Sequence, residues 1–537
     1  MTIFCSPLPV NATVREYRSG STEKQTLLAE MQSRCQNITN VPLLIGDQVR
    51  TSDNPVQISS PHKHAQVVAQ CSHADENDLA KAVKQAVRTQ KSWSKLSWEH
   101  RAAIFLKAAD LLEDKYRPAI NATTMLAQGK NVYQAEIDAA CELIDFLRYN
   151  VAFVEEIYRQ QPTSAAGIWN RSEYRGLEGF VYAISPFNFT SLAINLAAAP
   201  ALMGCAVLWK PSDPAALSNW VGMQLLLEAG LPEGVINFVP GDPVQVTDYL
   251  LRQPELAGIH FTGSTQVFRQ LWTKVGNNIN TYRNYPRLVG ETGGKDFVFA
   301  HSSADRPTLI NSLIRGAFEY QGQKCSAASR AYIAASVWHD IKDKLIEETA
   351  QIKMGDPIDF ANFMGAVISA PAYQRISGFL AEAKTTADVL VGGECDDTVG
   401  YYVRPTIIQT HDPKYRSMQE ELFAPVLTVY VYDDDKLDET LELCDTTSPF
   451  ALTGAIFASD RGVVAKMTDA LRYAAGNFYI NDKPTGAVVG QQPFGGSRAS
   501  GTNDKAGSIW NLTRWMSART IKDNFLPLTD YRYPHMT

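Results

Sequence analysis

The stretch that decides the fold begins with Phe180-Val181-Tyr182-Ala183-Ile184 and runs to Val275. Four short apolar runs in it read as strands, at residues 180–184, 205–209, 235–239 and 257–261. Helical runs follow them at 191–203, 214–229, 243–252 and 265–275. This alternation predicts right-handed βαβ crossovers and a parallel, doubly wound sheet. Such sheets bind ligands beyond the carboxyl ends of their strands.

A second α/β block is predicted from Asp296 to Ile480. Its expected strands are 297–299, 331–333 and 426–432, and its expected helices are 306–320 and 339–352. Before the first block, residues 41–72 suggest hairpins. Residues 76–91, 99–116 and 134–158 carry apolar side chains at three- and four-residue steps, which predicts amphipathic helices.

Composition describes an ordinary globular protein of several lobes. The chain has 537 residues, 45% hydrophobic and 20% charged, with a formal net charge of -7. No concentrated basic face is present, so we expect no nucleic-acid partner. We find no apolar run of about 18 to 20 residues and therefore expect no membrane span.

The eight cysteines are widely spaced, with no C-x-x-C pair and no nearby histidine cluster. This spacing indicates neither a disulfide framework nor a zinc site, so we expect no metal and a reducing compartment. Residues 1–20 show no clear presequence. The expected location is the cytoplasm for a bacterial chain and the mitochondrial matrix for a eukaryotic one.

Two motifs suggest acyl-transfer chemistry. Gly290-Glu291-Thr292-Gly293-Gly294-Lys295 offers a carboxylate in a glycine-rich turn, and Gln321-Gly322-Gln323-Lys324-Cys325-Ser326 offers a cysteine 34 positions after Glu291. A thiol nucleophile and a base that activates water would serve such an enzyme. Taken alone, Cys325 is more often an inert core residue, and Glu291 could be a turn carboxylate. The small neighbours of Cys325 favour an exposed thiol with a tuned pKa.

Three further motifs end predicted strands of the first block. Asn188 could donate to an oxyanion or could cap the next helix. Lys210 and Asp213 could bind ribose hydroxyls, although a solvated loop lysine is the commoner case. Gly263 and Ser264 open a helix whose amides suit a pyrophosphate, or simply cap it. The chain has no G-x-G-x-x-G fingerprint.

Together these motifs resemble the aldehyde dehydrogenase superfamily. The resemblance covers nearly the whole chain beyond residue 40, through Phe187-Asn188-Phe189, Lys210-Pro211, Phe261-Thr262-Gly263-Ser264, the two motifs of Glu291 and Cys325, 420–425, 477–481 and 493–496. It implies that Cys325 attacks an aldehyde carbon, that Asn188 and the Cys325 backbone N–H hold the oxyanion, and that Glu291 activates water.

The same resemblance implies a cofactor and a substrate site. NAD would be bound by Ser185, Lys210, Asp213, Gly263, Ser264, Glu421 and Phe423. Ser326 and the backbone of Gly486 and Ala487 would anchor a substrate carboxylate. Phe189 and Phe494 would enclose its aliphatic chain. Glu142 could meet an amine, although a solvated or capping carboxylate is nearly as good an interpretation.

Finer matches resemble the branch of that family that oxidises glutamate γ-semialdehyde to glutamate in proline catabolism. They lie at 144–148, 174–180, 318–320 and 489–505. Alternatives are another semialdehyde dehydrogenase, a phosphate-dependent acyl reductase, and a catalytically silent structural or binding protein on this scaffold. Retention of Glu291 favours hydrolysis over acyl reduction, and retention of Cys325 and Asn188 as well argues against a silent scaffold.

Three positions depart from the pattern of the family or of its branch. Phe268 replaces a glycine near the expected pyrophosphate, and Ala424 replaces the glycine of Glu-x-Phe-Gly-Pro. An alanine at a position with positive φ would be costly. Ala487 stands where some members of the branch have a serine.

We predict an α/β fold of three lobes. An NAD-binding domain would comprise 41–162 and 179–288, and a catalytic domain 289–506, after an N-terminal arm of residues 1–40. Residues 163–178 and 507–537 would form a small β flap. Because these two segments lack a core of their own, we expect them to pair across a homodimer or a larger homo-oligomer.

Overall fold

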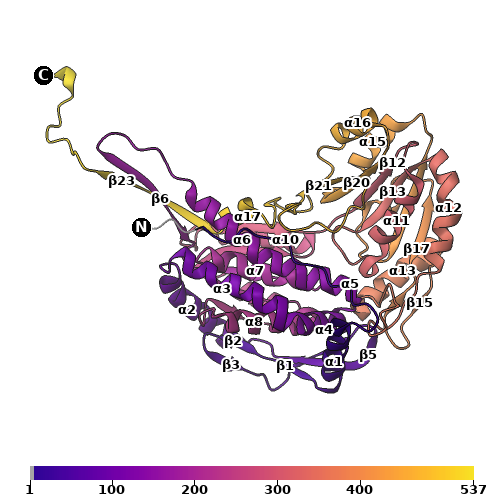
Figure 1. Cartoon of the computed structure of the whole chain (residues 1–537), viewed down its shortest axis with the longest axis horizontal. Helices are drawn as coiled ribbons and strands as arrows, with labels where there is room; N and C mark the ends of the chain where they lie inside the picture. Colours follow the sequence, from indigo (N-terminus) through magenta and orange to yellow (C-terminus); the bar gives the residue numbers. More distant parts are fainter. Residues whose placement is uncertain (1–4, 537) are drawn as a thin grey trace.

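Two seven-stranded sheets form the frame of the computed structural model, in the part of the chain that it describes, residues 5–536. The sheets lie in two lobes, and Figure 1 shows the first among the purple elements and the second among the orange ones. A long two-stranded ribbon extends away from the first lobe. None of the helices in the described range has both the length and the apolar character of a membrane span.

The first sheet has the strand order β11-β10-β7-β8-β9-β2-β3. Its strands are β2 (Leu43–Ile45), β3 (Gln48–Arg50), β7 (Phe180–Ile184), β8 (Ala206–Lys210), β9 (Ile236–Phe238), β10 (Leu256–Thr262) and β11 (Arg287–Glu291). The five from β7 to β11 are parallel, and β2 and β3 extend the sheet in antiparallel pairing. The predicted parallel, doubly wound sheet is confirmed.

Helices connect these parallel strands as the alternation predicted. They are α7 (Thr190–Leu202), α8 (Ala216–Ala229), α9 (Pro243–Leu250) and α10 (Thr265–Asn277). Every residue of α7 and of β10 is buried, so both read as continuous apolar runs without periodic polar positions. This burial on all sides is typical of the centre of a layered α/β fold.

The second sheet has the order β14-β17-β18-β13-β12-β20-β21. Its strands are β12 (Asp296–Ala300), β13 (Ala328–Ala334), β14 (Asp388–Val391), β17 (Thr406–Thr410), β18 (Val426–Tyr432), β20 (Thr453–Phe457) and β21 (Asn477–Ile480). Only β14, at one edge, pairs antiparallel. The helices α11 (Arg306–Phe318) and α12 (Ala335–Ala350) lie where two helices were expected, with bounds shifted by a few residues.

Two predicted helices are interrupted by π-helical turns. The helix expected at 99–116 is α3 (Trp98–Leu111) followed by the turn Leu112–Tyr116, and the one expected at 134–158 is mainly α6 (Glu142–Arg159) after the turn Glu136–Cys141. Arg117 follows the first turn and Glu136 opens the second. Their side chains form a buried ion pair, Nη2 to Oε1, of 2.5 Å. Steps of three and four residues do not distinguish such wide turns from α-helix.

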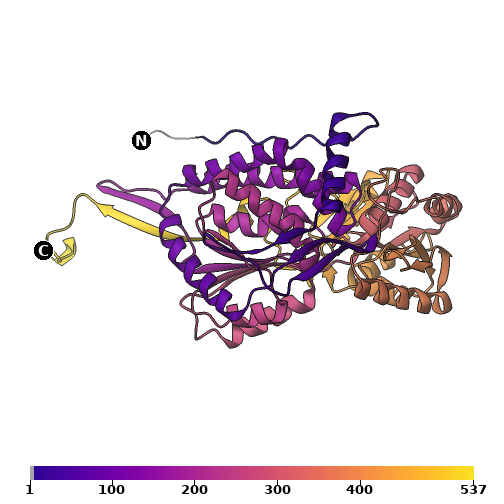
Figure 2. The ribbon, with the colours of Figure 1, turned by 90° about the horizontal axis from the view of Figure 1, so that it is seen from below.

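The N-terminal segment contributes to the core of the first lobe. Its helix α1 (Thr22–Gln36) is capped by Ser21 and packs against α4 (Arg117–Gln128). Leu27 and Met31 of α1 are fully buried. Residues 5–21 run in a mainly extended path over the outside of the lobe, as Figure 2 shows.

The expected flap segments pair with each other. β6 (Ile168–Gly176) and β23 (Met516–Asn524) form an antiparallel ribbon of nine paired positions. In the described part of the chain no further strand joins this ribbon. An isolated pair of strands is only marginally stable in water. Each strand of this ribbon also has one edge whose backbone N–H and C=O groups pair with no other strand.

Candidate active site

Glu291 and Cys325 meet where the chain crosses from the first sheet to the second. Glu291 is the last residue of β11, and Asp296, only five positions later, begins β12. The connecting turn passes so close to the cysteine that a Cβ on Gly294 would lie 2.0 Å from the Cys325 carbonyl oxygen. Only glycine permits this approach, so the turn places the carboxylate and the thiol in one site.

The loop that presents Cys325 is held in a strained backbone conformation. Tyr320 and Gln321 both have positive φ, 52° and 56°, which costs about 1 to 3 kcal/mol each for non-glycine residues. Their side chains bond to neighbouring backbone. Tyr320 Oη donates to Gln128 O at 3.0 Å, and Gln321 Nε2 donates to Ala366 O at 2.8 Å. These contacts fix the loop before the nucleophile.

Cys325 is half-buried, not exposed as expected. Burial raises the pKa of its thiol well above the usual range, and the nearby carboxylates of Glu291, Asp296 and Glu421 raise it further. The expectation of an exposed thiol is wrong, because the cysteine loop packs tightly against the turn at Gly294. In this state the thiol is neutral and needs a base.

Glu291 is suited to act as that base. Burial raises the pKa of Glu291 to about 8, against the opposing effect of the Lys505 ammonium, and the Asp504 carboxylate adds to the rise. A carboxyl group with a pKa near the working pH can both accept and release a proton. Its protonated form predominates below pH 8 and its basic form above.

Asn188 lies against the cysteine loop. It is buried, and its Nδ2 donates to Gln323 O at 3.0 Å, two residues before Cys325. Among the residues that the structure describes, its second amide hydrogen has no acceptor. The N-cap of α7 is Phe189 and not Asn188, so the helix-cap alternative is not what the structure shows.

Lys210 has the features of a ligand-binding residue. It ends β8, is 7% exposed, and within the described chain its ammonium makes no hydrogen bond or ion pair. Burial lowers the pKa of Lys210, and the Asp213 carboxylate opposes this. A buried, unpaired ammonium at a strand's carboxyl end fits ribose hydroxyls. The solvated-loop alternative for Lys210 does not hold.

Other predicted cofactor residues have partners within the protein. Ser185 Oγ accepts from Trp209 Nε1 at 3.0 Å, and Ser264 caps α10 by accepting from Val267 N at 3.3 Å. Glu421 Oε1 accepts from Gly294 N at 2.9 Å. Burial raises the pKa of Glu421 to about 7. Ser185 and Ser264 thus have structural roles whatever they bind.

The substitutions at Phe268 and Ala424 have structural explanations. Phe268 is buried, stacks on Phe261 with ring centroids 5.4 Å apart, and fills the space over Gly290. The positive φ expected near Ala424 falls instead on Phe423, at 53°. Ala424 therefore carries no backbone strain, and Phe423 packs edge-on against Phe187 at 5.8 Å.

A pocket beside Cys325 gathers every predicted substrate residue. It is lined by Asp138, Glu142, Phe146, Phe189, Leu192, Lys324, Cys325, Ser326, Thr485, Gly486, Ala487, Val489, Gln492, Phe494 and Ala506. Ser326 Oγ and Thr485 Oγ1 share a hydrogen bond of 2.7 Å. Burial raises the pKa of Glu142 to about 8, with a further rise from the Asp138 carboxylate. Glu142 is thus neither a solvated carboxylate nor a helix cap.

The sequence motifs did not predict a buried group of charges that forms part of the wall of this pocket. Lys130 Nζ pairs with Asp138 Oδ2 at 2.7 Å and lies 4.2 Å from the centre of the Phe189 ring. Lys324 Nζ lies 3.7 Å from the same Asp138 oxygen. Lys130 and Asp138 belong to no local motif, so only the tertiary structure reveals them. The Lys130 ammonium positions the Phe189 ring.

Asn11 links the N-terminal segment to the loop that carries Gly486 and Ala487. Its Nδ2 donates to Asp145 Oδ2 and to Val489 O, both at 2.8 Å. Its Oδ1 accepts from Gln491 Nε2 at 3.0 Å and from Tyr149 Oη at 3.2 Å. One side chain thus holds this loop against α6, which carries Glu142. The polar sequence around Asn11 contains no motif that predicts this contact.

The geometry of the site defines a class of enzyme. A neutral thiol, a carboxyl group of pKa about 8 and a buried lysine at the carboxyl end of a parallel strand describe an α/β oxidoreductase with covalent thiol catalysis. The chain belongs to the aldehyde dehydrogenase family, whose model matches residues 49–521.

Several proteins are similar to this chain over nearly their full length. The chain is 53% identical to a Dictyostelium discoideum protein named Delta-1-pyrroline-5-carboxylate dehydrogenase, mitochondrial, over 99% of this chain and 96% of that one. Identity to the Homo sapiens protein of the same name is 49%, over 98% and 94%. A crystal structure of the Mycobacterium tuberculosis Delta-pyrroline-5-carboxylate dehydrogenase bound with NAD superposes with a TM-score of 0.96 at 52% identity, covering 100% and 99%.

Replacing Asn11 tests the positioning of the loop. We expect Asn11→Ala to raise KM for a substrate held by Gly486 and Ala487 by roughly 3- to 10-fold, the effect of about one hydrogen bond. The kcat should change little, because Cys325 and Glu291 are untouched. Steady-state kinetics measure this. Asn40→Ala, which removes an exposed asparagine, is the control, and equal KM values for both variants would contradict the role.

Proposed function

We propose that this chain oxidises L-glutamate γ-semialdehyde, the open form of Δ1-pyrroline-5-carboxylate, to L-glutamate with NAD in proline catabolism. The observation that carries the proposal is the pocket beside Cys325, whose lining combines Ser326, Gly486 and Ala487, groups that could donate to a carboxylate, with the acidic side chain of Glu142. An α-amino acid that bears an aldehyde matches both. The names of the close relatives support this substrate.

The first chemical step forms a bond between Cys325 Sγ and the aldehyde carbon. The thiol proton passes to a base, for which Glu291 is placed, and the carbonyl oxygen becomes an oxyanion. The free amide hydrogen of Asn188 and the Cys325 backbone N–H stabilise that charge. Removing one such donor typically costs about 100- to 1,000-fold in kcat.

NAD, when bound, accepts the hydride that leaves the thiohemiacetal carbon and so allows a thioester to form on Cys325. Lys210 and Asp213 would hold one ribose, and Glu421 the other. Glu421 can do so after exchanging its bond to Gly294 N for ribose hydroxyls. The residues present therefore fit the cofactor, and the crystal structure of the bacterial relative was determined with NAD.

Hydrolysis of the thioester completes the reaction. Glu291, after losing the thiol proton to solvent, removes a proton from water, and the hydroxide oxygen attacks the acyl carbon. The carbon–sulfur bond breaks, the proton on Glu291 passes to the departing Cys325 sulfur, and the acid product loses its own proton to solvent to become the carboxylate. Because the pKa of Glu291 is about 8, its basic form grows as the pH rises through 8. Retention of this carboxylate favours hydrolysis over transfer of the acyl group to phosphate.

Substrate recognition would use both ends of the amino acid. Ser326 and the backbone amides of Gly486 and Ala487 bind the α-carboxylate, and Glu142 receives the amine. Phe189 and Phe494 enclose the methylene groups. Compared with members of the branch that have serine at this position, Ala487 lacks one hydroxyl contact to the carboxylate, which weakens the free energy of binding by about 0.5 to 1.5 kcal/mol.

A panel of aldehydes tests the proposed substrate. We expect the highest kcat/KM for glutamate γ-semialdehyde. Glutarate semialdehyde, which lacks only the amine, should fall roughly 10- to 100-fold, the range for a hydrogen bond to a charged group. Butanal, which lacks the carboxylate as well, should fall further. Glu142→Gln should reduce the difference in kcat/KM between glutamate γ-semialdehyde and glutarate semialdehyde. Equal kcat/KM for all three aldehydes would reject the proposal.

The domain division and the oligomer belong to the same proposal. Residues 41–162 and 179–288 would form the NAD-binding domain, 289–506 the catalytic domain, and the ribbon of β6 and β23 an oligomerisation flap. The ribbon and the tail after it expose Trp169, Phe525, Leu526, Leu528 and Tyr531. A second copy of the chain would cover these side chains and the free strand edges. For a eukaryotic chain, mitochondrial location follows the relatives' names.

Truncation tests the flap. We expect the native chain to have the mass of a dimer or a larger assembly in light scattering, and a chain that ends at Trp515 to have the mass of one chain. Tyr473→Ser, which removes an exposed aromatic in the second lobe, is the control and should remain assembled. A truncated chain that keeps the native mass would contradict this interface.

A further inference from the structure

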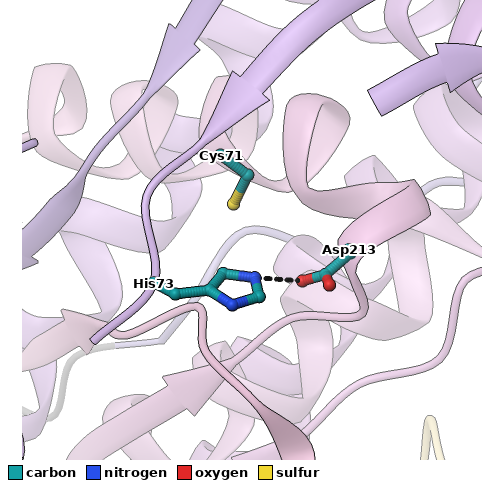
Figure 3. Close-up of side chains that lie close together, drawn as sticks. All are labelled: Cys71, His73 and Asp213. Atoms are coloured by element: carbon teal, nitrogen blue, oxygen red, sulfur yellow. Dashed lines mark hydrogen bonds and ion pairs between the residues drawn. The ribbon is translucent and has the colours of Figure 1, made fainter. Parts of the chain in front are cut away.

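Three side chains with metal-binding chemistry converge near Lys210. Cys71 ends β5 (Lys63–Cys71), His73 follows two positions later, and Asp213 lies in the short helix Asp213–Ala215 after β8. Figure 3 shows the thiol, the imidazole and the carboxylate facing one another. Their ligand atoms all lie within 4.8 Å, and His73 Nε2 is 3.1 Å from Asp213 Oδ1.

These distances approach those of a bound zinc ion. Zn–S and Zn–N bonds of about 2.3 and 2.0 Å separate tetrahedral ligand atoms by roughly 3.3 to 3.5 Å. The His73 and Asp213 atoms, 3.1 Å apart, must separate slightly to reach this spacing. The three ligand atoms lie within 4.8 Å of one another, so no pair has to approach by more than roughly 1.5 Å. A thiolate, an imidazole and a carboxylate, with water in the fourth position, suit zinc and the divalent cobalt that replaces it.

The balance of charge also permits a cation. Asp213 supplies one negative charge, and Cys71 supplies a second only when an ion displaces its thiol proton, whereas the Lys210 ammonium supplies one positive charge nearby. The group is therefore about neutral before the ion binds, and its ligands and Lys210 together have a net charge of about -1 once the thiol is deprotonated. Cys71 is fully buried, and within residues 5–536 its Sγ makes one weak hydrogen bond, to Ser72 O at 3.7 Å. Binding releases the thiol proton to solvent and gives the buried sulfur a partner.

We propose that Cys71, His73 and Asp213 form a site for one divalent cation of the zinc class, and that an ion there excludes the dinucleotide. The exclusion rests on the proposed function, in which Lys210 and Asp213 bind a cofactor ribose. The cysteine spacing indicated no zinc site because Asp213 is 140 positions from His73. The ends of β5 and β8 bring these positions together.

Cobalt spectroscopy tests the metal site without turnover. The full chain carrying Cys325→Ser, which removes the active-site thiol, is titrated with Co²⁺. We expect a sulfur-to-cobalt charge-transfer band and visible bands of tetrahedral cobalt that saturate at one ion per chain. Adding Cys71→Ala should abolish the charge-transfer band, and adding His73→Gln should weaken binding at least tenfold.

A matched variant controls for the loss of a buried thiol. Cys444→Ala, which removes a buried cysteine in the second lobe, should leave the cobalt spectrum unchanged. Absence of the band in the Cys325→Ser chain, or its persistence after Cys71→Ala, would overturn the site. In that case Cys71 is an ordinary buried cysteine, and His73 and Asp213 form only a pair.

Competition between cobalt and NAD tests whether an ion in this site excludes the dinucleotide. Saturating NAD should remove the cobalt bands, and Zn²⁺ should inhibit the native enzyme competitively with NAD. Cys71→Ala should relieve this inhibition and leave turnover without metal unchanged. Cobalt bands unaffected by NAD would overturn the exclusion. Because the bands are read without a substrate, they separate failure of this proposal from failure of the proposed activity.

Discussion

The close contact between the Gly293-Gly294 turn and the cysteine loop is the constraint on which the active site depends. A Cβ on Gly293 would lie 2.5 Å from Glu421 Oε2, and one on Gly294 would lie 2.0 Å from Cys325 O. The turn joins β11 of the first sheet to β12 of the second. Any larger residue would separate the two sheets at the point where carboxylate, thiol and cofactor residues must meet.

Burial is the second consequence of that contact. It raises the pKa of the Cys325 thiol and brings the pKa of Glu291 to about 8, so one group starts neutral and the other can exchange protons. The same enclosure requires precise loops. Tyr320 and Gln321 accept unfavourable backbone angles because their side chains bond to the backbone around Gln128 and Ala366. The strain is offset locally, and the nucleophile is held ready.

The first sheet and the two central catalytic residues could be predicted from the sequence. Residues 180–275 alternate between apolar strand-like runs and helical runs, which predicts a parallel sheet. Glu291 and Cys325 lie in short distinctive motifs. Asn11, Lys130 and Cys71 could not be found this way, because their partners lie far along the chain and their neighbours carry no pattern. The π-helical turns were missed since periodicity does not register one extra residue. The burial of Cys325 was missed because it depends on contacts with the Gly293-Gly294 turn, more than 30 positions earlier in the chain.

Intact mass spectrometry of Glu291→Gln tests the central claim most directly. The variant is mixed with NAD and Δ1-pyrroline-5-carboxylate, and its mass is followed with time. The account predicts a covalent acyl adduct that maps to Cys325. The adduct forms more slowly than in the native chain because the base for the thiol is lost, persists far longer than one native turnover, and does not form in Glu291→Gln/Cys325→Ala. Normal steady-state turnover by Glu291→Gln, or an adduct on another residue, would contradict it.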